Sequence, residues 1–480
     1  MLPLKRSKGS EDSAASRRRL SDLRSGAPYT SQSALSAVLE HVRDHGLPSN
    51  SLSRRTLNRA RDAIATQSTP YGNLVKTIEL QCIAPLVPIT FDVACPFSML
   101  HLAAKTKQFG ALLQDALKRD TPSPTRPWGL IYYCDEITPG NGLKAENLRQ
   151  TQSVYYSFLN LGSAVLAKED AWMTFATLKS SDVTKVRGGM SAVTSEMLKM
   201  LFTGTTFTLD GVGVLVQCGE VSHRLYASFQ CTLCDESSLH QVWQHKGASG
   251  VKFCVECRNM VASSWIGLPG LAPGSFLKPF TDPQAYDETG LVRHTRETIF
   301  AIIDELAAAS ASGISNNALV TIERRLGFTH CPQGILAQPS LRRIIDPTQQ
   351  NCYDWPHSLL QGAFPLLVGK IERDLKALGF NMYQALHIYC KNFTWPRRLE
   401  LKGARGGEAF SAKRARGSHK HGLFKATQSE VLSVYMIIAY WMRAVLQPLD
   451  VLSTAVSAYL ALADFTSMLV ATAKGLVHTW

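Results

Sequence analysis

The sequence predicts a mixed α/β fold in which a central sheet is followed by a mostly helical C-terminal half. Three observations lead to this prediction. Short apolar runs of strand composition recur between residues 128 and 233, they alternate with segments of helical spacing, and from about residue 290 the helical period dominates. The composition, 45% hydrophobic and 19% charged over 480 residues, is that of a globular protein with room for more than one domain.

The N-terminal part of the chain is expected to be a tail followed by helices. Residues 1–33 are rich in Ser, Arg and Lys without an apolar period, which predicts a disordered basic tail. Region 34–127 is expected to be helical, because SALSAVLEHVRDHG, SLSRRTLNRARDAIATQ and the stretch at 97–118 all have amphipathic helical spacing. The Pro-containing segment 121–127 then indicates a linker.

The core of the predicted fold lies in residues 128–260. WGLIYYCDEI (128–137) and AWMTFATLKS (171–180) have the composition of buried strands. SAVTSEMLKMLF (191–202) has helical spacing, and two more strand-like runs, GVGVLVQ and RLYASFQCTL, precede the helical segment SSLHQVW. This alternation of strands and helices is what predicts a mixed α/β core.

Beyond the core the sequence predicts mostly helices. We expect residues 261–425 to form a helical insertion with a basic loop at 401–422, and residues 426–480 to form helices that close the core. The last apolar stretch, 451–473, is long enough to cross a membrane but contains Asp464. Because a carboxylate at the bilayer centre is costly, we predict a buried helix and no membrane partner.

The charge of the chain favours an anionic partner. The net charge is +13, and nucleic acid is the commonest partner of so basic a protein, ahead of an acidic membrane surface or a merely solvated basic face. No secretory signal is evident at the N-terminus, so we expect an intracellular protein, nuclear if KRSK and RRR act as an import signal. Neither a P-loop nor a G-x-S-x-G motif is present, so NTPase and serine-hydrolase functions lack support.

The cysteines indicate a metal site. Eleven cysteines in a chain without a secretory signal favour metal ligands or free thiols over disulfides. CTLC and CVEC place Cys231, Cys234, Cys254 and Cys257 in a C-x2-C-x19-C-x2-C pattern, which is typical of a closed tetrahedral zinc site. We therefore predict a structural Zn²⁺ held by these four thiolates.

Two alternatives to this ligand set stay open. Cys231 and Cys234 fall in a strand-like run, so they could be buried core thiols. His240 and His245 lie between the two cysteine pairs, so the second pair with one or both histidines would also make a zinc site.

Two acidic residues suggest a second kind of metal chemistry. Asp135 and Asp235 each end a strand-like run, and carboxylates in that position can converge at one edge of a sheet. Two divalent cations held in this way activate a nucleophile and stabilise the leaving oxygen in phosphodiester cleavage. Acids near strand ends are common, so the pattern alone carries little weight.

A family resemblance adds to it. The order YYCDEITPGN, then alternating strands and a helix, then CDESSLHQVWQHKGASGVKFCVECRN and YDWPHSLLQGAF resembles the DDE/D transposases of mobile DNA elements, in particular their Plavaka- and CACTA-like branch. The resemblance runs from about Trp128 to about Tyr435. It implies an RNase H-like core, DNA as partner and catalytic Mg²⁺ or Mn²⁺. It also implies a zinc knuckle at Cys254 and Cys257 and a D-x-x-H segment at Asp354–His357.

The same resemblance implies roles for the acids. Asp135 would be the first catalytic carboxylate and Asp235 the second. The third should open a late helix, as Glu430 does in ATQSEVLSVYMIIAYW, and Asp354 and Glu372 are its rivals.

Three functions are consistent with the sequence. The first is a transposase-like enzyme that cleaves and joins DNA strands, with a homo-oligomer as an option. The second is a non-catalytic zinc-containing DNA-binding protein, a decayed or domesticated copy that keeps the fold and has lost the chemistry. The third is a globular protein of another role whose basic charge is incidental.

Overall fold

The computed structural model describes residues 66–84, 87–137, 150–260, 291–394 and 407–473, together with isolated positions between 38 and 64. By its internal contacts the chain divides into a unit of residues 1–67 and a unit of residues 68–480. The second unit contains two separate hydrophobic cores, one built between Ile78 and Ile345 and the other between Leu360 and Ala463.

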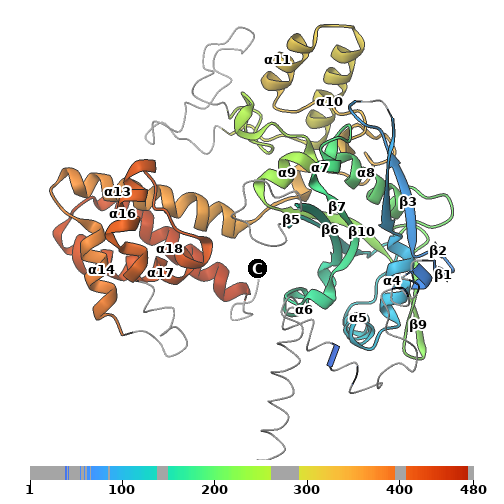
Figure 1. Cartoon of the computed structure of the whole chain (residues 1–480), viewed down its shortest axis with the longest axis horizontal. Helices are drawn as coiled ribbons and strands as arrows, with labels where there is room; N and C mark the ends of the chain where they lie inside the picture. The colour runs from blue at the N-terminus through green and yellow to red at the C-terminus, as the bar shows by residue number, and fades with distance from the viewer. Residues whose placement is uncertain are drawn as a thin grey trace, which may run out of the picture. The chain divides into compact units, whose positions relative to one another are not determined.

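A five-stranded mixed sheet organises the first core (Figure 1). Its strand order is β11-β10-β5-β6-β7. Strands β5 (Trp128–Ile137), β6 (Thr151–Phe158) and β7 (Met173–Lys179) form an antiparallel meander, whereas β10 (Ala227–Cys234) and β11 (Asn351–Tyr353) add on the other side of β5, parallel to it. The predicted mixed α/β fold with a central sheet is therefore confirmed.

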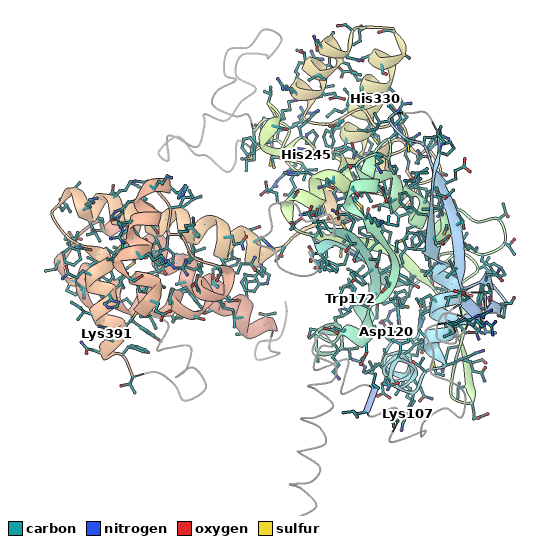
Figure 2. The ribbon with its side chains drawn as sticks, viewed as in Figure 1. Lys107, Asp120, Trp172, His245, His330 and Lys391 are labelled. Carbon is teal, nitrogen blue, oxygen red and sulfur yellow. The ribbon has the colours of Figure 1, made fainter. Side chains whose placement is uncertain are left out.

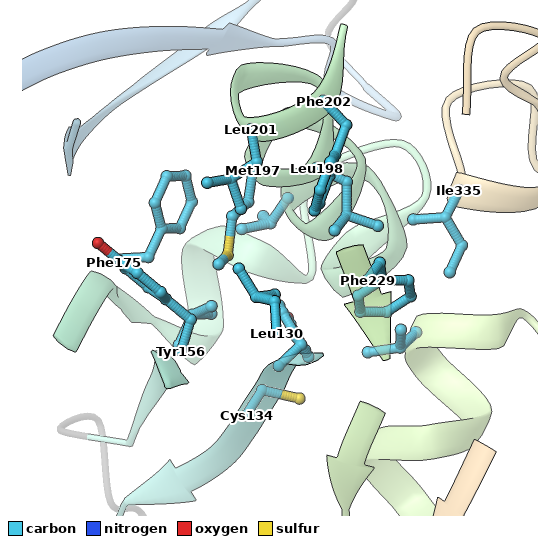
Figure 3. Packing of buried hydrophobic residues seen from close by; sticks show 14 of the residues in the cluster. Leu130, Cys134, Tyr156, Phe175, Met197, Leu198, Leu201, Phe202, Phe229 and Ile335 are labelled. Carbon is cyan, nitrogen blue, oxygen red and sulfur yellow. The ribbon is translucent and has the colours of Figure 1, made fainter. Parts of the chain in front are cut away.

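Strand β5 is central because its sequence is apolar on both sides. Its alternate residues Trp128, Leu130 and Tyr132 are fully buried on one face of the sheet. Helix α8 (Gly189–Phe202) covers that face, and the Tyr132 hydroxyl lies 2.7 Å from Thr194 Oγ1 on this helix. Figure 3 shows Leu130 packed below Met197 and Leu198 of the helix. The other face of the sheet carries the remaining residues of β5.

The connection from the meander to the parallel strands begins with the short helix α7 (Ser180–Val183). Helix α8 comes next, and a hairpin of β8 (Val214–Cys218) and β9 (Val221–Leu225) follows it. Helix α9 (Glu236–Trp243) leaves the end of β10 and packs beside α8. The sequence predicted β8, β10 and the helices α8 and α9, and it missed β9.

The sequence predicted helices throughout the region 34–127, but the described part of this region also contains strands. Strands β3 (Val75–Leu80) and β4 (Ile89–Ala94) pair in antiparallel fashion because their alternate apolar residues turn to the first core. Two short strands, β1 (Ser68–Thr69) and β2 (Gly72–Asn73), precede them.

The helix expected at 97–118 is two helices, α4 (Pro96–Ala104) and α5 (Lys107–Arg119). Thr106 separates them by capping α5, since its side chain accepts a hydrogen bond from the Phe109 N–H. The short loop between them therefore has a definite local cause.

The first core ends with helices, as the sequence predicted beyond residue 290. Helix α10 (Arg296–Ala311) begins at a capping box formed by Thr295 and Thr298. Helix α11 (Asn316–Leu326) is capped by Ser315 and ends at Gly327, which adopts a φ of 84°.

The second core is entirely helical in its described part. It is built by α13 (Phe364–Ala377), α14 (Met382–Asn392), α16 (Ala412–His421), α17 (Gln428–Trp441) and α18 (Ser453–Ala473). The prediction of helices in this half is confirmed, but the expectation that residues 426–480 close the α/β core is wrong, because the buried residues of α17 and α18 belong to the second core. The basic loop expected at 401–422 is wrong from Ala412 onward, because α16 occupies that segment; residues 401–406 lie outside the described residues.

Two stretches of the second core, Gln428–Leu449 and Ser453–Thr472, are long and apolar enough to cross a membrane by length and composition alone. Core helices of globular proteins pass the same test, so the length and composition of these helices are weak evidence of a membrane span. In α18 one face is buried, with Tyr459 and Ala463 fully covered, while Phe465 and Met468 stay about half exposed. The buried helix predicted at 451–473 is therefore buried on one side only.

Candidate active site

Asp135 and Asp235 occupy matching positions on adjacent parallel strands. The last registered pair of β5 and β10 is Tyr133 with Leu233. In the next pair, both residues are cysteines, and their sulfur atoms lie 3.2 Å apart. The two aspartates follow directly. Because neighbouring strands are spaced by about 4.8 Å, the fold brings these two predicted acids side by side at one end of the sheet.

Asp354 extends this pair to a third strand. β11 runs parallel to β10 with Tyr353 opposite Cys234, so Asp354 stands beside Asp235. Asp235 is thus the middle of a row of three aspartates that spans about two strand spacings, roughly 10 Å. We call Asp135, Asp235 and Asp354 the aspartate row. It lies at the carboxyl ends of the three parallel strands.

The aspartate row lies on the face of the sheet opposite helix α8. Asp135 is two residues beyond Tyr133 on the same strand, and side chains at this spacing share a face. The Tyr133 hydroxyl donates a hydrogen bond to Asp135 Oδ2 over 3.1 Å. Burial, and after it the negative charge of Asp135, raises the pKa of Tyr133 well above its usual range, with a smaller contribution from Asp354. The tyrosine hydroxyl therefore stays protonated and remains a donor.

Each carboxylate of the aspartate row has one oxygen engaged locally. Asp235 caps helix α9, accepting a hydrogen bond from the Ser238 N–H over 2.7 Å. Asp354 Oδ2 lies 2.5 Å from His357 Nδ1. Within the described parts of the chain, the second oxygen of all three aspartates makes no hydrogen bond. These local bonds orient the carboxylates and leave one oxygen of each for another ligand.

The two glutamates considered for the third acid belong to the helical core. Glu430 opens helix α17, as predicted, and both of its oxygens are used there: one accepts from the Thr427 N–H at 2.8 Å and the other pairs with Arg414 at 2.6 Å. Glu372 is buried, 7% exposed, and pairs with His419 at 2.6 Å. Both glutamates therefore have a structural role that accounts for their positions.

The first cysteine pair does not form the tight turn expected of a zinc knuckle. Cys231 and Cys234 lie in the extended strand β10, because that segment pairs with β5 and β11 on its two sides. Cys234 contacts Cys134, and Cys231 hydrogen-bonds with Cys352 on β11. The structure therefore agrees with the alternative that Cys231 and Cys234 are buried core thiols.

The second cysteine pair does lie together. Burial and then the neighbouring Cys254 raise the pKa of Cys257 to about 11. The Arg293 guanidinium lies 3.6 Å from Cys257 Sγ. Over the described residues, however, no three His, Cys, Asp or Glu side chains come close enough to hold a metal ion. Within the described residues, the pair therefore supplies two thiols and gains no further ligand.

The two histidines proposed as alternative zinc ligands neighbour each other, with ring centroids 5.4 Å apart. Burial lowers the pKa of His245 to about 3, and His240 adds to this effect. His245 Nδ1 accepts a hydrogen bond from the Gly247 N–H over 3.2 Å, so the neutral ring carries its proton on Nε2. A neutral imidazole binds a metal through an unprotonated nitrogen, so His245 fits a core position against Phe328 better than a zinc site.

The sequence did not predict an aromatic pocket that lies on the same face as the aspartate row. Its volume is about 550 Å³. It is lined by the side chains of Tyr133, Tyr155, Glu169, Trp172, Thr174 and Leu233. The Tyr133 ring lies 6.0 Å from that of Tyr155, nearly parallel, and 5.7 Å from that of Trp172, which is labelled in Figure 2. The sequence shows aromatic residues at 133 and 155, but that they lie next to each other follows only from the pairing of strands β5 and β6.

No family model matches this chain, and a search of curated proteins returned no match. What the site does is therefore inferred from its geometry and charge.

Proposed function

We propose that this chain is a transposase-like protein whose aspartate row binds divalent cations and whose activity is the cleavage and joining of DNA phosphodiester bonds. The observation that carries the proposal is the register of Asp135, Asp235 and Asp354 on three adjacent parallel strands. Three carboxylates at one end of a sheet form the type of oxygen-rich site that Mg²⁺ and Mn²⁺ prefer. Asp354, rather than Glu430 or Glu372, is then the third acid.

The strand order supports an RNase H-like core. A three-stranded antiparallel meander is extended beside its first strand by two parallel strands, and α8 lies in the connection between the two parts. This is the strand order of RNase H-like sheets. The acids of the aspartate row then fall on the first, fourth and fifth strands of that order.

The residues of the row are suited to hold cations in a fixed arrangement. The helix cap at Asp235, the His357 partner of Asp354 and the Tyr133 hydroxyl on Asp135 each restrain one carboxylate oxygen. Divalent cations, when bound, would activate the attacking oxygen and stabilise the leaving one. The protein's own contribution is to orient the carboxylates and to keep their second oxygens available.

The charge distribution supports DNA as the partner. Beside the net charge of +13, helix α16 carries Lys413, Arg416 and Lys420 along one exposed face, at i, i+3 and i+7. No ion pair of these three is found among the described residues. A helix face of this kind neutralises phosphates and releases counterions, so binding should weaken steeply with salt. A nuclear location is included in the proposal, because the proposed substrate is DNA.

The experiment is a nicking assay on supercoiled plasmid with Mg²⁺, Mn²⁺ or EDTA. We expect metal-dependent nicking by the wild type, and loss of nicking in Asp135→Ala and Asp354→Ala. Glu430→Gln, which keeps an acceptor at the helix cap, is the matched control and should nick at the wild-type rate. A wild type that binds DNA but cuts it with none of the metals would refute the proposed activity.

That outcome would favour a second candidate, a non-catalytic zinc-containing DNA-binding protein. One observation bears on both candidates: within the described residues no three His, Cys, Asp or Glu side chains lie close enough together to hold a metal ion, and this applies to the aspartate row and to the second cysteine pair alike. The zinc in either case is proposed at Cys254 and Cys257, the pair that lies together.

A further inference from the structure

The aromatic pocket and the aspartate row are continuous on the sheet. Tyr133 and Leu233, which line the pocket, stand two residues before Asp135 and Asp235 on the same strands. Side chains two residues apart share a face, about 7 Å along the strand. The hydrogen bond from the Tyr133 hydroxyl to Asp135 joins the two directly. A ligand in the pocket would therefore extend toward the carboxylates.

The walls of the pocket suit a flat ring with polar edges. Tyr133, Tyr155 and Trp172 present ring surfaces, all of them partly exposed. Glu169 and Thr174 add an acceptor and a hydroxyl to the lining, and Glu169 has no ion pair among the residues described. A volume of about 550 Å³ is within the usual range of small-ligand pockets. A nucleobase meets these requirements, because it stacks by its faces and offers amino groups at its edge.

The surrounding charge favours a ligand that continues as a polyanion. Lys179 ends strand β7 on the same face of the sheet, two residues beyond the level of Asp135, and is exposed. No acidic partner of Lys179 is found in the described parts of the chain. A phosphate next to a base in the pocket would thus lie between the Lys179 ammonium group and the aspartate row.

We infer that the aromatic pocket binds a single unstacked nucleobase of a DNA strand and thereby presents the neighbouring phosphate to the aspartate row. This inference rests on the proposed function and defines the form of its substrate. In a regular duplex both faces of a base are stacked on its neighbours, so only an unpaired, frayed or extruded base can lie against these rings.

The test uses a single-stranded oligonucleotide with one 2-aminopurine, whose fluorescence is quenched by stacking, in EDTA so that no cleavage occurs. We expect quenching by the wild type and no quenching when the same residue is embedded in a fully paired duplex. Trp172→Ala and Tyr155→Ala should each lose the quenching and weaken single-strand binding about tenfold, the effect of one lost base–aromatic stack.

Tyr440→Ala is the matched control, because it removes a ring that is 44% exposed on helix α17 instead. It should bind and quench as the wild type does. Circular dichroism and thermal melting establish that each variant is folded. Should Trp172→Ala unfold, Tyr155→Ala carries the test alone.

The two proposals fail in different ways. Wild-type protein that nicks DNA but does not quench 2-aminopurine, or pocket variants that quench as the wild type does, would overturn the base-binding pocket and leave the cleavage site standing. The converse result is a wild type that fails to nick DNA while Asp135→Ala still quenches 2-aminopurine. That result would support the base-binding pocket and refute the proposed cleavage activity.

Discussion

The Tyr133 hydroxyl donates a hydrogen bond to Asp135 Oδ2 over 3.1 Å, and so one residue of strand β5 belongs both to the aromatic pocket and to the aspartate row. The phenol orients the carboxylate, and the ring forms a wall of the pocket. The two roles can be separated, because a phenylalanine keeps the ring and loses the donor.

Tyr133→Phe should therefore reduce nicking while leaving single-strand binding within about twofold of wild type. A hydrogen bond to a charged group contributes about 1.5–3 kcal/mol, so a loss of about tenfold or more in the nicking rate is expected. Nicking rates at several Mn²⁺ concentrations are the measurement. A variant that cuts as fast as the wild type would show that this hydrogen bond does not orient the carboxylate.

Substitutions of Asp235 should separate charge from helix capping. Asp235→Ala removes the cap of α9 and should lower the free energy of unfolding by about 1 kcal/mol. Asp235→Asn caps as well as aspartate but carries no charge, so it should keep the stability and lose the nicking. Urea denaturation and the plasmid assay on both variants check this; wild-type nicking by Asp235→Asn would remove Asp235 from the site.

The stability of the first core should fall in acid because of His245. Its pKa is lowered to about 3 by burial, whereas in the unfolded chain it is near 6.5. The unfolded state therefore binds a proton that the folded state does not, and stability is full above pH 6.5 and declines as pH falls toward 3. The expected slope is about 1.4 kcal/mol per pH unit from this residue. Urea melts at pH 7, 6 and 5 measure it.

His245→Gln is the control for that experiment, since it keeps an acceptor for the Gly247 N–H and cannot titrate. Its stability should vary less between pH 7 and pH 5 than that of the wild type. Equal slopes for both proteins would mean that other groups cause the acid sensitivity.

The zinc proposal makes a prediction that divides the four cysteines. Cys254→Ser should lose the bound zinc, because the thiolate pair at 254 and 257 is then broken. Cys231→Ala should keep it, since Cys231 lies in strand β10 against Cys352. Metal analysis of the purified proteins measures the zinc content of each variant. If Cys231→Ala also loses the zinc, all four cysteines would be ligands, and strand β10 would have to rearrange to bring them together.

Two glycines of the second core should respond in opposite directions to alanine. A Cβ on Gly369 would lie 2.6 Å from the Gly422 carbonyl oxygen, so Gly369→Ala should destabilise by about 1–3 kcal/mol. A Cβ on Gly417 in helix α16 meets only the flexible end of Lys425 at 3.8 Å, and Gly417→Ala should stabilise by about 0.5–1 kcal/mol. Denaturant unfolding of both variants measures the difference.

The sequence predicted those parts of the fold whose signal is local. Strand β5 was predicted at its observed bounds, because a long apolar run between turn residues is typical of a central strand. Helix α16 was missed since AKRARGSHKH has the composition of a solvated loop, and its helical form depends on packing Ala415 and Ser418 into the second core. The β3–β4 hairpin was missed for a similar reason: its alternation is short and only half apolar.

The site was predictable only in part. Asp135 and Asp235 end strands with a clear apolar signal, so their approach could be expected from sequence. The position of Asp354 depends on β11, a strand of three residues that exists through its pairing with β10. In the same way, the spacing of Cys231 and Cys234 predicts a knuckle, but the spacing does not encode that this segment is extended between two partners.

The central claim, that the aspartate row binds divalent cations, is tested most directly by Mn²⁺ titration followed by electron paramagnetic resonance of the free ion. The wild type should bind Mn²⁺ and release it to excess Mg²⁺, and Asp135→Asn and Asp235→Asn should each lose this binding while remaining folded. Glu430→Gln should bind as the wild type does. A wild type that binds no Mn²⁺, or Mn²⁺ binding that survives in both aspartate variants, would contradict the claim.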